Sequence, residues 1–479
     1  MHSLDTMQAL PASSTENIPT DTTLTEVQPR LSEAAAEAWI PRTCFKNGPP
    51  SRLGVELELL VADASRPDGL SAHFPQHRYP GLLAGLAHGG LDGLLTVEPG
   101  GQVELSSRPG QTLVDTVDVV RRDLAALQER ASQQGAKLVG IGTDPFRAPL
   151  RTANQPRYDA MERYLDGWGP AGRVMMCSTA SVQVNIEAGV VGHTDAQPPT
   201  LGIVPPQPVI TFQDRWDLLH AIGPALVAAF ANAGWRTGRP TGWKSSRQAV
   251  WLDLDPSRTG VPTAHPGERL EEAYTRWALD APLMLIRQDR GSWAAPAGVS
   301  FRTWLRRGQG VIADRPPPTT EDLAYHLTTL FPQVRPRGHY EVRFIDAQPG
   351  DWWTVPVAVI AGLLSDAAAA DQARADCEPV EGRWRAAAQL GVTDHELFRS
   401  ANGVLQTAVE ALRRDPANSE LAAKVERYRE RWTARGRCPA DDPPTGVDDE
   451  ARRDAVADNN LPSADTKLPK TDFPGDKKK

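Results

Sequence analysis

The sequence predicts an α+β fold in which helices pack on one face of an antiparallel sheet, and two observations support this prediction. Four short segments alternate apolar and polar residues with a period of two, which is typical of strands with one face on a core and one in water. Several longer segments place their apolar residues on one stripe, as amphipathic helices do. Strands of a parallel sheet are usually apolar on both faces, so the alternation favours antiparallel pairing.

The predicted strands carry mostly glutamate, glutamine, asparagine or arginine on the face that points away from the core. They cover residues 53–59, 102–106, 181–187 and 341–344. The predicted helices cover residues 112–134, 156–164, 218–232, 268–279 and 320–330. Thr320 is placed as the N-cap of the last helix, because Glu321 and Asp322 follow it at the positive end of the helix dipole.

The composition is that of an ordinary globular protein. Of 479 residues, 40% are hydrophobic and 23% are charged, which excludes wholesale disorder. The 52 basic and 60 acidic residues give a net charge of −8, which argues against nucleic acid as the main partner. No apolar run reaches the roughly 18 residues of a spanning helix, and the first residues lack a signal-peptide pattern. We therefore expect a cytoplasmic protein with no membrane partner.

Both ends of the chain differ in composition from the part between them. Residues 1–34 and 441–479 are rich in Thr, Ser, Pro and charge and poor in large apolar side chains. Such segments bury too little apolar surface to offset the entropy of ordering them, so both are predicted to be mobile tails. Residues 35–440 contain no internal repeat and no long linker, which favours one catalytic domain.

The polar faces of the strands are unusually acidic. They carry Glu56, Glu58, Glu104 and Glu341, and Glu98 stands just before the second strand. Glutamates two positions apart on a strand project to the same side, roughly 7 Å apart. Hard divalent cations such as Mg²⁺ would gather such carboxylates. The alternative for any single glutamate is an exposed strand face.

Sequence patterns that usually bind nucleotide phosphates are absent. The segment from Gly238 to Ser245 imitates a P-loop, but Trp243 stands where the glycine before Lys244 is required. If phosphate binds, metal ions and arginines on the sheet must hold it.

Seven short strings occur along the chain in a familiar order. They are GVELE at 54–58, EPGGQVELS at 98–106, RYDAM at 157–161, TASVQVN at 179–185, SRQAVW at 246–251, YHLTTLFP at 325–332 and EVR at 341–343. Together they resemble the plant and actinobacterial type of glutamate–cysteine ligase. Within that family the likeness is greatest to the actinobacterial ligases that supply γ-glutamylcysteine for ergothioneine biosynthesis.

The resemblance implies a fold like the catalytic domain of glutamine synthetase, a curved antiparallel sheet that forms a funnel with helices packed outside. It also implies an ATP-dependent reaction. ATP would phosphorylate the γ-carboxylate of L-glutamate, and the amine of L-cysteine would displace phosphate to give γ-glutamylcysteine. The small-molecule partners would then be L-glutamate, L-cysteine and ATP. A monomer is favoured.

The resemblance also implies a role for each site residue. Glu56, Glu58, Glu104 and Glu341, with Glu98 as a further member, would hold two or three Mg²⁺ ions. Gln183 and Asn185 would lie near the nucleotide or metal.

Arginines supply the other implied roles. Arg343 would reach the transferring phosphate, and an ion pair with a neighbouring glutamate is its alternative. Arg247 would grip a glutamate carboxylate through two hydrogen bonds. Arg157 and Tyr158 would contribute to the same contact, or would serve only to start a helix.

Other functions stay open at this stage. A related carboxylate–amine ligase could use a different amine, since no single residue specifies cysteine. A non-catalytic binder could keep the fold, although the retained carboxylates argue against it. The loop from Asn232 to Lys244 departs from related sequences and leaves the substrate rim undetermined.

Overall fold

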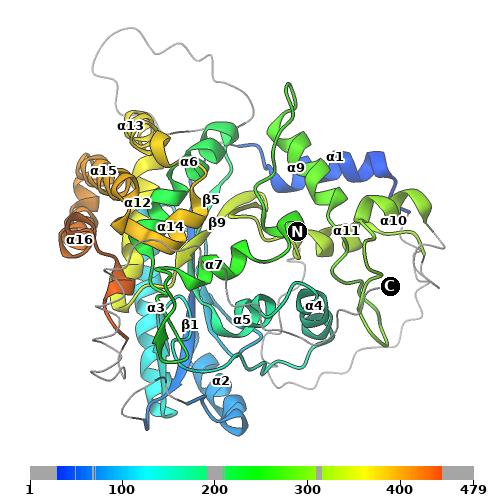
Figure 1. Cartoon of the computed structure of the whole chain (residues 1–479), viewed down its shortest axis with the longest axis horizontal. Coiled ribbons are helices and arrows are strands. Elements are labelled where there is room, and N and C mark those ends of the chain that lie inside the picture. Colours follow the sequence, from blue (N-terminus) through cyan, green and yellow to red (C-terminus); the bar gives the residue numbers. More distant parts are fainter. Residues whose placement is uncertain are drawn as a thin grey trace, which may run out of the picture.

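The computed structural model describes residues 30–48, 50–66, 70, 72–190, 209, 211–308 and 316–444. Figure 1 shows a central sheet with helices around it, so the predicted α+β class is confirmed. In this described part no single helix is long and apolar enough to cross a membrane. One bent pair, Gly350–Leu364 with Ala367–Val380, passes that test by length and composition only.

The main sheet has seven strands in the order β2-β3-β1-β5-β9-β8, with β4 also paired to β1. Their bounds are β1 Leu53–Asp63, β2 Leu94–Val97, β3 Val103–Ser106, β4 Ala136–Val139, β5 Ser181–Glu187, β8 Val334–Pro336 and β9 His339–Asp346. Every pairing is antiparallel, as predicted. A separate two-stranded ribbon is formed by β6 Trp235–Arg236 and β7 Arg239–Pro240.

The strand register brings the acidic faces together. Glu58 of β1 is directly opposite Glu104 of β3, and Glu56 is opposite Gln183 of β5. On the other edge of β5, Asn185 is opposite Glu341 of β9. Directly opposed residues project to the same face of a sheet. The polar positions of four strands therefore form one continuous surface.

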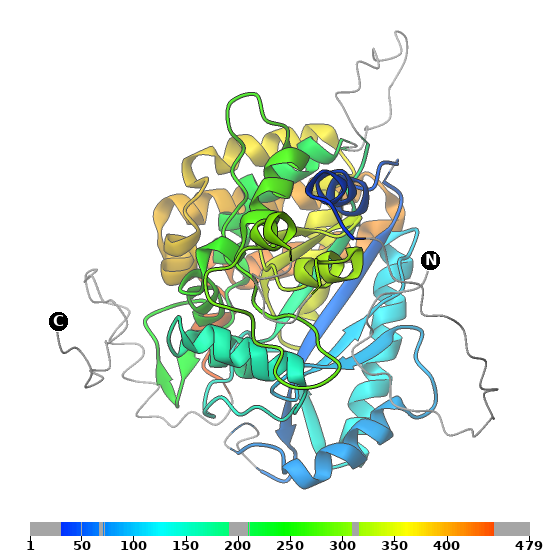
Figure 2. The ribbon, with the colours of Figure 1, turned by 90° about the vertical axis from the view of Figure 1, so that its right-hand side faces the viewer.

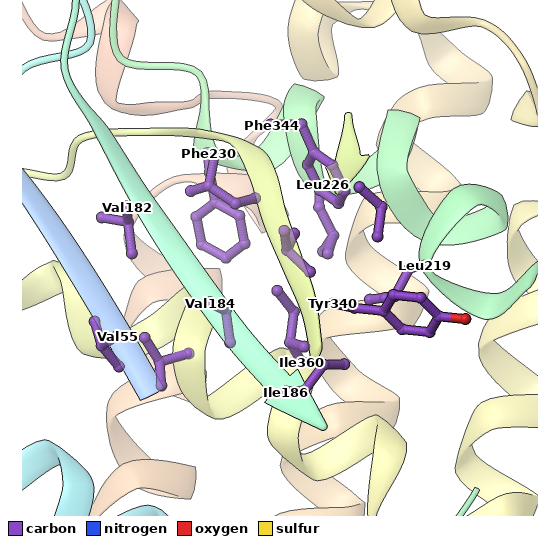
Figure 3. Close-up of a cluster of buried hydrophobic side chains, with 14 of the residues drawn as sticks. Val55, Val182, Val184, Ile186, Leu219, Leu226, Phe230, Tyr340, Phe344 and Ile360 are labelled. Atoms are coloured by element: carbon purple, nitrogen blue, oxygen red, sulfur yellow. The ribbon is translucent and has the colours of Figure 1, made fainter. Parts of the chain in front are cut away.

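The apolar face of the sheet carries the main core. Long helices cover it, chiefly α3 Leu113–Gln133, α6 Phe212–Phe230 and α12 Thr354–Leu364, and α15 His395–Arg413 packs on α6 and α12 from outside. Figure 3 shows Val55 and Val184 from the sheet packed toward Leu226 and Phe230 of α6 and toward Ile360 of α12. These side chains are at most 2% exposed, so burial of this face supplies most of the hydrophobic stabilisation.

The remaining helices complete both sides of the molecule. They are α1 Glu33–Cys44, α2 Tyr79–Ala87, α4 Pro156–Asp166, α5 Ala171–Ser178, α7 Ser246–Leu252, α8 Pro256–Thr259, α9 Leu270–Asp280, α10 Phe301–Arg307, α11 Thr320–Leu327, α13 Ala367–Cys377, α14 Trp384–Leu390 and α16 Ser419–Arg431. In Figure 2 the side with α1, α10 and α11 faces the viewer, and the helices from α12 onward lie behind.

Shorter helices enclose the polar face, which corrects the prediction that helices cover one face only. Apolar residues of α4, α5 and α7 form a second hydrophobic cluster that includes Tyr158, Met161, Met176 and Trp251. These helices bury their apolar residues against one another in this cluster. They can therefore lie over the polar face without displacing its charged residues. The polar strand faces consequently line a cavity rather than open water.

Two predicted helix starts need correction. The N-cap of α11 is Thr319, whose hydroxyl accepts the backbone N–H of Asp322. Helix α6 begins at Phe212, six residues before the predicted start. Its first turns bury Phe212, Arg215 and Trp216 on one side, and the charged Arg215 interrupts the apolar stripe by which the sequence would have shown this part of the helix.

The predicted tail boundaries also shift by a few residues. Helix α1 begins at Glu33, and Leu31 before it is 6% exposed. At the other end, Asp441 accepts a hydrogen bond from the Lys244 ammonium at 2.5 Å. Residues 30–34 and 441–444 therefore belong to the folded part. The rest of both predicted tails, 1–29 and 445–479, lies outside the described residues.

Candidate active site

A cavity of about 1210 Å³ lies over the polar face of the sheet. Ten predicted site residues line it: Glu56, Glu58, Glu98, Glu104, Arg157, Tyr158, Gln183, Arg247, Glu341 and Arg343. Asn185 is not part of the lining, but its side-chain amide donates to Glu56 at 2.9 Å. Residues far apart in the chain thus meet at one site, which alternation within single strands could not show.

Among the described residues, no basic side chain forms an ion pair with Glu56, Glu98 or Glu104. Burial, reinforced by neighbouring carboxylates, raises the pKa of Glu56 and of Glu104 to about 8 and that of Glu98 to about 7. Polar groups orient them, since Glu104 accepts the hydroxyls of Thr96 and Ser106 at 3.2 and 3.0 Å. A buried carboxylate without a counter-charge favours its neutral form unless a cation is supplied.

Glu58 is held in a similar way. Its carboxylate accepts the side-chain amide of Gln183 at 2.8 Å. Within the described residues, no three His, Cys, Asp or Glu side chains come close enough together to hold one metal ion. The predicted division of the five glutamates among Mg²⁺ ions therefore stays a prediction.

Glu341 lies in a different environment, because three arginines surround it. Arg335 donates to both of its oxygens, at 2.7 and 2.8 Å, and Arg343 donates to Oε1 at 2.5 Å. Arg337 is 3.7 Å away. Burial opposes ionisation, but the charges of Arg335, Arg343 and Arg337 outweigh it and hold the pKa of Glu341 well below its usual value. The carboxylate of Glu341 therefore fixes the positions of Arg335 and Arg343 through the hydrogen bonds that it accepts from them.

Two glycines position Glu98 at the edge of the cavity. The backbone turns through Gly101, which has a φ of +86°, a conformation that other residues rarely adopt. Gly100 passes so close to α5 that a Cβ atom there would lie 2.3 Å from the Cys177 carbonyl oxygen. The positive φ of Gly101 and the close approach of Gly100 to α5 thus explain why two glycines stand together in the EPGGQ string.

Arg343 contacts the carboxylate cluster as well as the cavity. Besides Glu341, its guanidinium donates to the Gln183 side chain at 3.0 Å. The alternative predicted for this arginine, an ion pair with a neighbouring glutamate, is therefore present. Its position in the cavity wall still leaves it next to any phosphate bound over the sheet.

Arg247 lies at the start of α7 and is 2% exposed. Its Nη2 donates to the Arg343 carbonyl at 2.8 Å, and its Nη1 lies 3.8 Å from the Asp346 carboxylate. Among the described residues its Nε and Nη1 have no hydrogen-bond partner, and both nitrogens are closed off from solvent. Arg247 thus places a positive charge in the cavity wall, and the predicted two-bond contact with a glutamate carboxylate stays a prediction.

Arg157 and Tyr158 begin α4, and the structure gives Arg157 a clear structural role. Its guanidinium donates to the hydroxyl and the carbonyl of Thr328 at 3.1 and 3.3 Å and lies over the Tyr325 ring. It therefore ties α4 to α11 at the cavity wall. Tyr158 is buried, which together with the Glu98 charge raises its pKa.

Sequence reasoning missed three residues of the site. Arg335 and Arg337 come from a short strand and turn before β9, in the string RPRGH at 335–339. The sequence did offer a signal for them, because Gly338 predicts a turn. A hairpin at this turn places Arg335 opposite Glu341. Asp346, beside Arg247, ends β9 and lies two residues beyond the predicted strand, where it carried no recognisable signal.

The loop from Asn232 to Lys244 does not contribute to the cavity lining. The backbone N–H of Asn232 donates to Asp346 at 2.9 Å, and Lys244 pairs with Asp441. These contacts give both ends of the loop a structural role, and the part of the loop in the substrate rim, left open by the sequence, stays undetermined.

A cavity with a floor of strand carboxylates and a wall of arginines is the arrangement expected of a carboxylate–amine ligase, an enzyme that must bind anionic substrates and neutralise transferring phosphate. Comparison with known proteins agrees. The chain belongs to the glutamate–cysteine ligase family 2, which matches residues 52–457. The protein is therefore a ligase, and the predicted resemblance is confirmed.

Three relatives are similar to this chain, two of them over most of their own length and one over half of it. The glutamate–cysteine ligase EgtA of Mycobacterium tuberculosis (strain ATCC 25618 / H37Rv) is 35% identical over 415 residues, covering 86% of this chain and 89% of the relative. EgtA of Mycolicibacterium smegmatis is 36% identical over 421 residues, with 86% and 90% covered. The chloroplastic glutamate–cysteine ligase of Brassica juncea is 31% identical over 281 residues, with 57% and 50% covered.

Among solved structures, the glutamate–cysteine ligase of Francisella tularensis in complex with AMP has a TM-score of 0.46 at 12% identity, with 82% and 84% of the two chains covered. A likeness this low carries no argument about the site.

Proposed function

We propose that this protein is an ATP-dependent glutamate–cysteine ligase. It joins the γ-carboxylate of L-glutamate to the amine of L-cysteine and forms γ-glutamylcysteine, ADP and phosphate. The observation that carries this proposal is the single cavity in which uncompensated carboxylates face Arg247 and Arg343. Membership of the family adds the reaction class.

The chemistry needs two steps. A carboxylate is a poor acyl donor, because its leaving group would be oxide. A γ-carboxylate oxygen of glutamate first attacks the γ-phosphorus of ATP, the bond to the bridging oxygen breaks, and ADP leaves. The cysteine amine nitrogen then attacks the carbonyl carbon of the acyl phosphate. The C–O bond breaks, phosphate leaves and the nitrogen loses a proton.

The residues of the cavity fit these steps. Arg343 neutralises charge on the transferring phosphoryl group, which is the main demand of such a reaction. Arg247, a buried cation of the cavity wall, holds a glutamate carboxylate once its guanidinium turns toward the cavity, and so fixes the reacting end.

Hard oxygen donors without counter-charges fit Mg²⁺. The ion would be held by Glu56, Glu58, Glu98 and Glu104. Glu341 would contribute indirectly, through the arginines whose positions it fixes. When bound, Mg²⁺ would neutralise the phosphate oxygens of ATP. We also propose that the protein acts in the cytoplasm and that its product enters ergothioneine biosynthesis, following the resemblance to the actinobacterial ligases.

The test is a substrate panel with purified protein, ATP and Mg²⁺. We expect ADP and phosphate to form with L-glutamate and L-cysteine but not with D-glutamate or L-aspartate in place of L-glutamate. Hydroxylamine should replace cysteine and yield γ-glutamyl hydroxamate. Formation of AMP and pyrophosphate would exclude the acyl phosphate. Turnover with another amine and none with cysteine would replace the proposal by the related ligase, and absence of all turnover would favour the non-catalytic binder.

A further inference from the structure

The turn between β8 and β9 presents an arginine to the candidate active site. Arg337 and Gly338 connect the two strands, and Gly338 has a φ of +81°. The turn is tied to the end of α1, because the backbone N–H of Gly338 donates to the Cys44 carbonyl at 2.8 Å. The backbone N–H of Arg337 donates to the His339 carbonyl at 2.7 Å. The backbone of the turn is therefore held in place, and the side chain of Arg337 lines the cavity.

The guanidinium of Arg337 is not committed to the protein as its neighbours are. Arg335 and Arg343 both donate hydrogen bonds to Glu341. In the part of the chain that the structure describes, Arg337 donates no side-chain hydrogen bond, and its one ion-pair contact is the 3.7 Å from Nη1 to Glu341. Its side chain is 49% exposed. A guanidinium carries five N–H donors in a planar fork, so Arg337 can bind an anion without giving up a hydrogen bond.

Glu341 lies between Arg337 and Arg343. Arg343 donates to Oε1 at 2.5 Å, whereas Arg337 approaches Oε2. The two cations therefore lie close together, one at each oxygen of the same carboxylate. Arg337 is near Glu56 as well: burial and the charges of Glu341 and Glu104 raise the pKa of Glu56, and the charge of Arg337 opposes this rise.

Two neighbouring cations match two neighbouring phosphates of ATP. Arg343 is assigned above to the transferring γ-phosphoryl group, so the phosphate joined to it needs a second cation beside the first. Arg335 cannot supply it, since it already donates to Glu341 and to the Leu330 carbonyl. Negative charge develops on the β-phosphate as the γ-phosphoryl group departs, and a positioned donor there stabilises the transition state.

We propose that Arg337 is a further catalytic residue, which binds the β-phosphate of ATP and neutralises the charge that ADP gains as it leaves. The inference rests on the proposed function. The bond between the γ-phosphorus and the bridging oxygen breaks, and its electron pair stays on the β-phosphate. The N–H groups of Arg337 donate to this phosphate, no proton is transferred, and Arg337 remains a cation throughout.

The test compares two nucleotides that differ by one phosphate. ADP carries the β-phosphate and AMP lacks it, so the ratio of their affinities isolates the proposed contact. Isothermal titration calorimetry of the full chain at saturating Mg²⁺ measures both dissociation constants. We expect Arg337→Gln to weaken ADP binding about ten-fold or more, as loss of a hydrogen bond between charged groups does, and to leave AMP binding within about two-fold.

Two further variants provide the controls. Arg290 is an exposed arginine that lines the same cavity, so Arg290→Gln removes the same charge and should leave both affinities unchanged. Arg337→Lys keeps the charge and should retain more of the ADP affinity than Arg337→Gln. An indirect effect through Mg²⁺ would have the opposite sign, because loss of a positive charge near Glu56 favours binding of a cation.

The reaction supplies a second measurement. Arg337→Gln should lower kcat about ten-fold or more and change the KM for L-glutamate less than about two-fold. Equal weakening of ADP and AMP, unchanged ADP binding, or the same loss in Arg290→Gln would each overturn the proposal. If ADP binding depends on Arg337 but the unaltered protein shows no turnover in the substrate panel, the proposed function fails and the β-phosphate contact stands.

Discussion

Arg335 holds Glu341 by two parallel hydrogen bonds across the β8–β9 hairpin, in which the two residues are directly opposed. Both side chains are at most 9% exposed. A planar guanidinium is the group that matches a carboxylate in this way. The pair fixes Glu341 so that its Oε1 can also accept Arg343 at the cavity wall.

The first prediction concerns this pair. Arg335→Lys keeps the positive charge but loses the planar guanidinium, so Glu341 loses one of the two hydrogen bonds that Arg335 donates. We expect a loss of about 2 kcal/mol in the free energy of unfolding, measured by urea denaturation. Arg337→Lys is the matched control, because Arg337 is half exposed and 3.7 Å away, and it should cost less than about 1 kcal/mol. Equal effects of the two changes would contradict the assigned role.

The second prediction separates two glutamates of the site. Glu341→Gln removes the charge that three buried or half-buried arginines share, so it should destabilise the protein by about 3 kcal/mol or more. Glu56→Gln instead removes a carboxylate whose neighbours are Glu104 and Glu341, and the unfolding free energy should fall little or rise. Both variants should lose roughly two or more orders of magnitude in rate. A stability loss of the same size in both would show that Glu56 has a basic partner.

The third prediction tests how Arg247 is used. Arg247→Lys keeps a positive charge without the planar fork, and it should raise the KM for L-glutamate far more than the KM for ATP. Asp346→Asn should act in the same direction, because the Asp346 carboxylate lies 3.8 Å from Nη1 and helps to orient it. Steady-state kinetics with each substrate varied in turn would measure both. An equal increase for the two substrates would assign Arg247 to phosphate or to folding.

The fourth prediction is a pH dependence of stability. His326 is 4% exposed and bonds the Ala278 carbonyl at 2.8 Å. Burial, aided by the Arg258 charge, lowers its pKa from 6.5 to about 3. Below pH 6.5 the unfolded chain binds a proton that the folded chain does not, so stability is lost as the pH falls.

His326→Gln keeps a side-chain donor but cannot titrate, and it provides the comparison. Between pH 7 and pH 5 the unaltered protein should lose about 2 kcal/mol more unfolding free energy than the variant. Urea denaturation at the two pH values measures this difference. Parallel losses in the two proteins would mean that His326 titrates normally in the folded state.

The fifth prediction concerns the turn before β3. Gly100→Ala would place a methyl group against the Cys177 backbone, and we expect a loss of about 1–3 kcal/mol. Gly81→Ala in α2 meets nothing within 4 Å and should be neutral or stabilise by up to about 1 kcal/mol. Thermal unfolding of both variants provides the measurement. A stable Gly100→Ala protein would show that the turn can move away from α5.

Much of the site could be predicted because its residues lie on strands. Alternation with a period of two is a local property, and it placed Glu56, Glu58 and Glu104 on one face without knowledge of the strand order. The register then aligned these faces, since each strand also had to bury its apolar side. Burial of one face leaves a strand little choice of register.

Helix boundaries and caps were predicted less well than strands. In the first turns of α6 a buried arginine, Arg215, stands on the side that faces the core, so the apolar stripe is interrupted there. The N-cap of α11 shifted by one residue because Thr319 and Thr320 are equally suitable side chains, and only the backbone geometry decides between them.

The sequence by itself determined the fold class, the acidic strand faces and the family of this protein, because each depends on patterns within a short stretch of chain. The tertiary structure alone decided the state of each charged group. Glu341 differs from Glu56 through Arg335, which comes from a three-residue strand too short to show alternation. Arg157 contacts Thr328, 171 residues away. Electrostatic energies depend on distance in space and on burial, and neither is encoded in any local pattern.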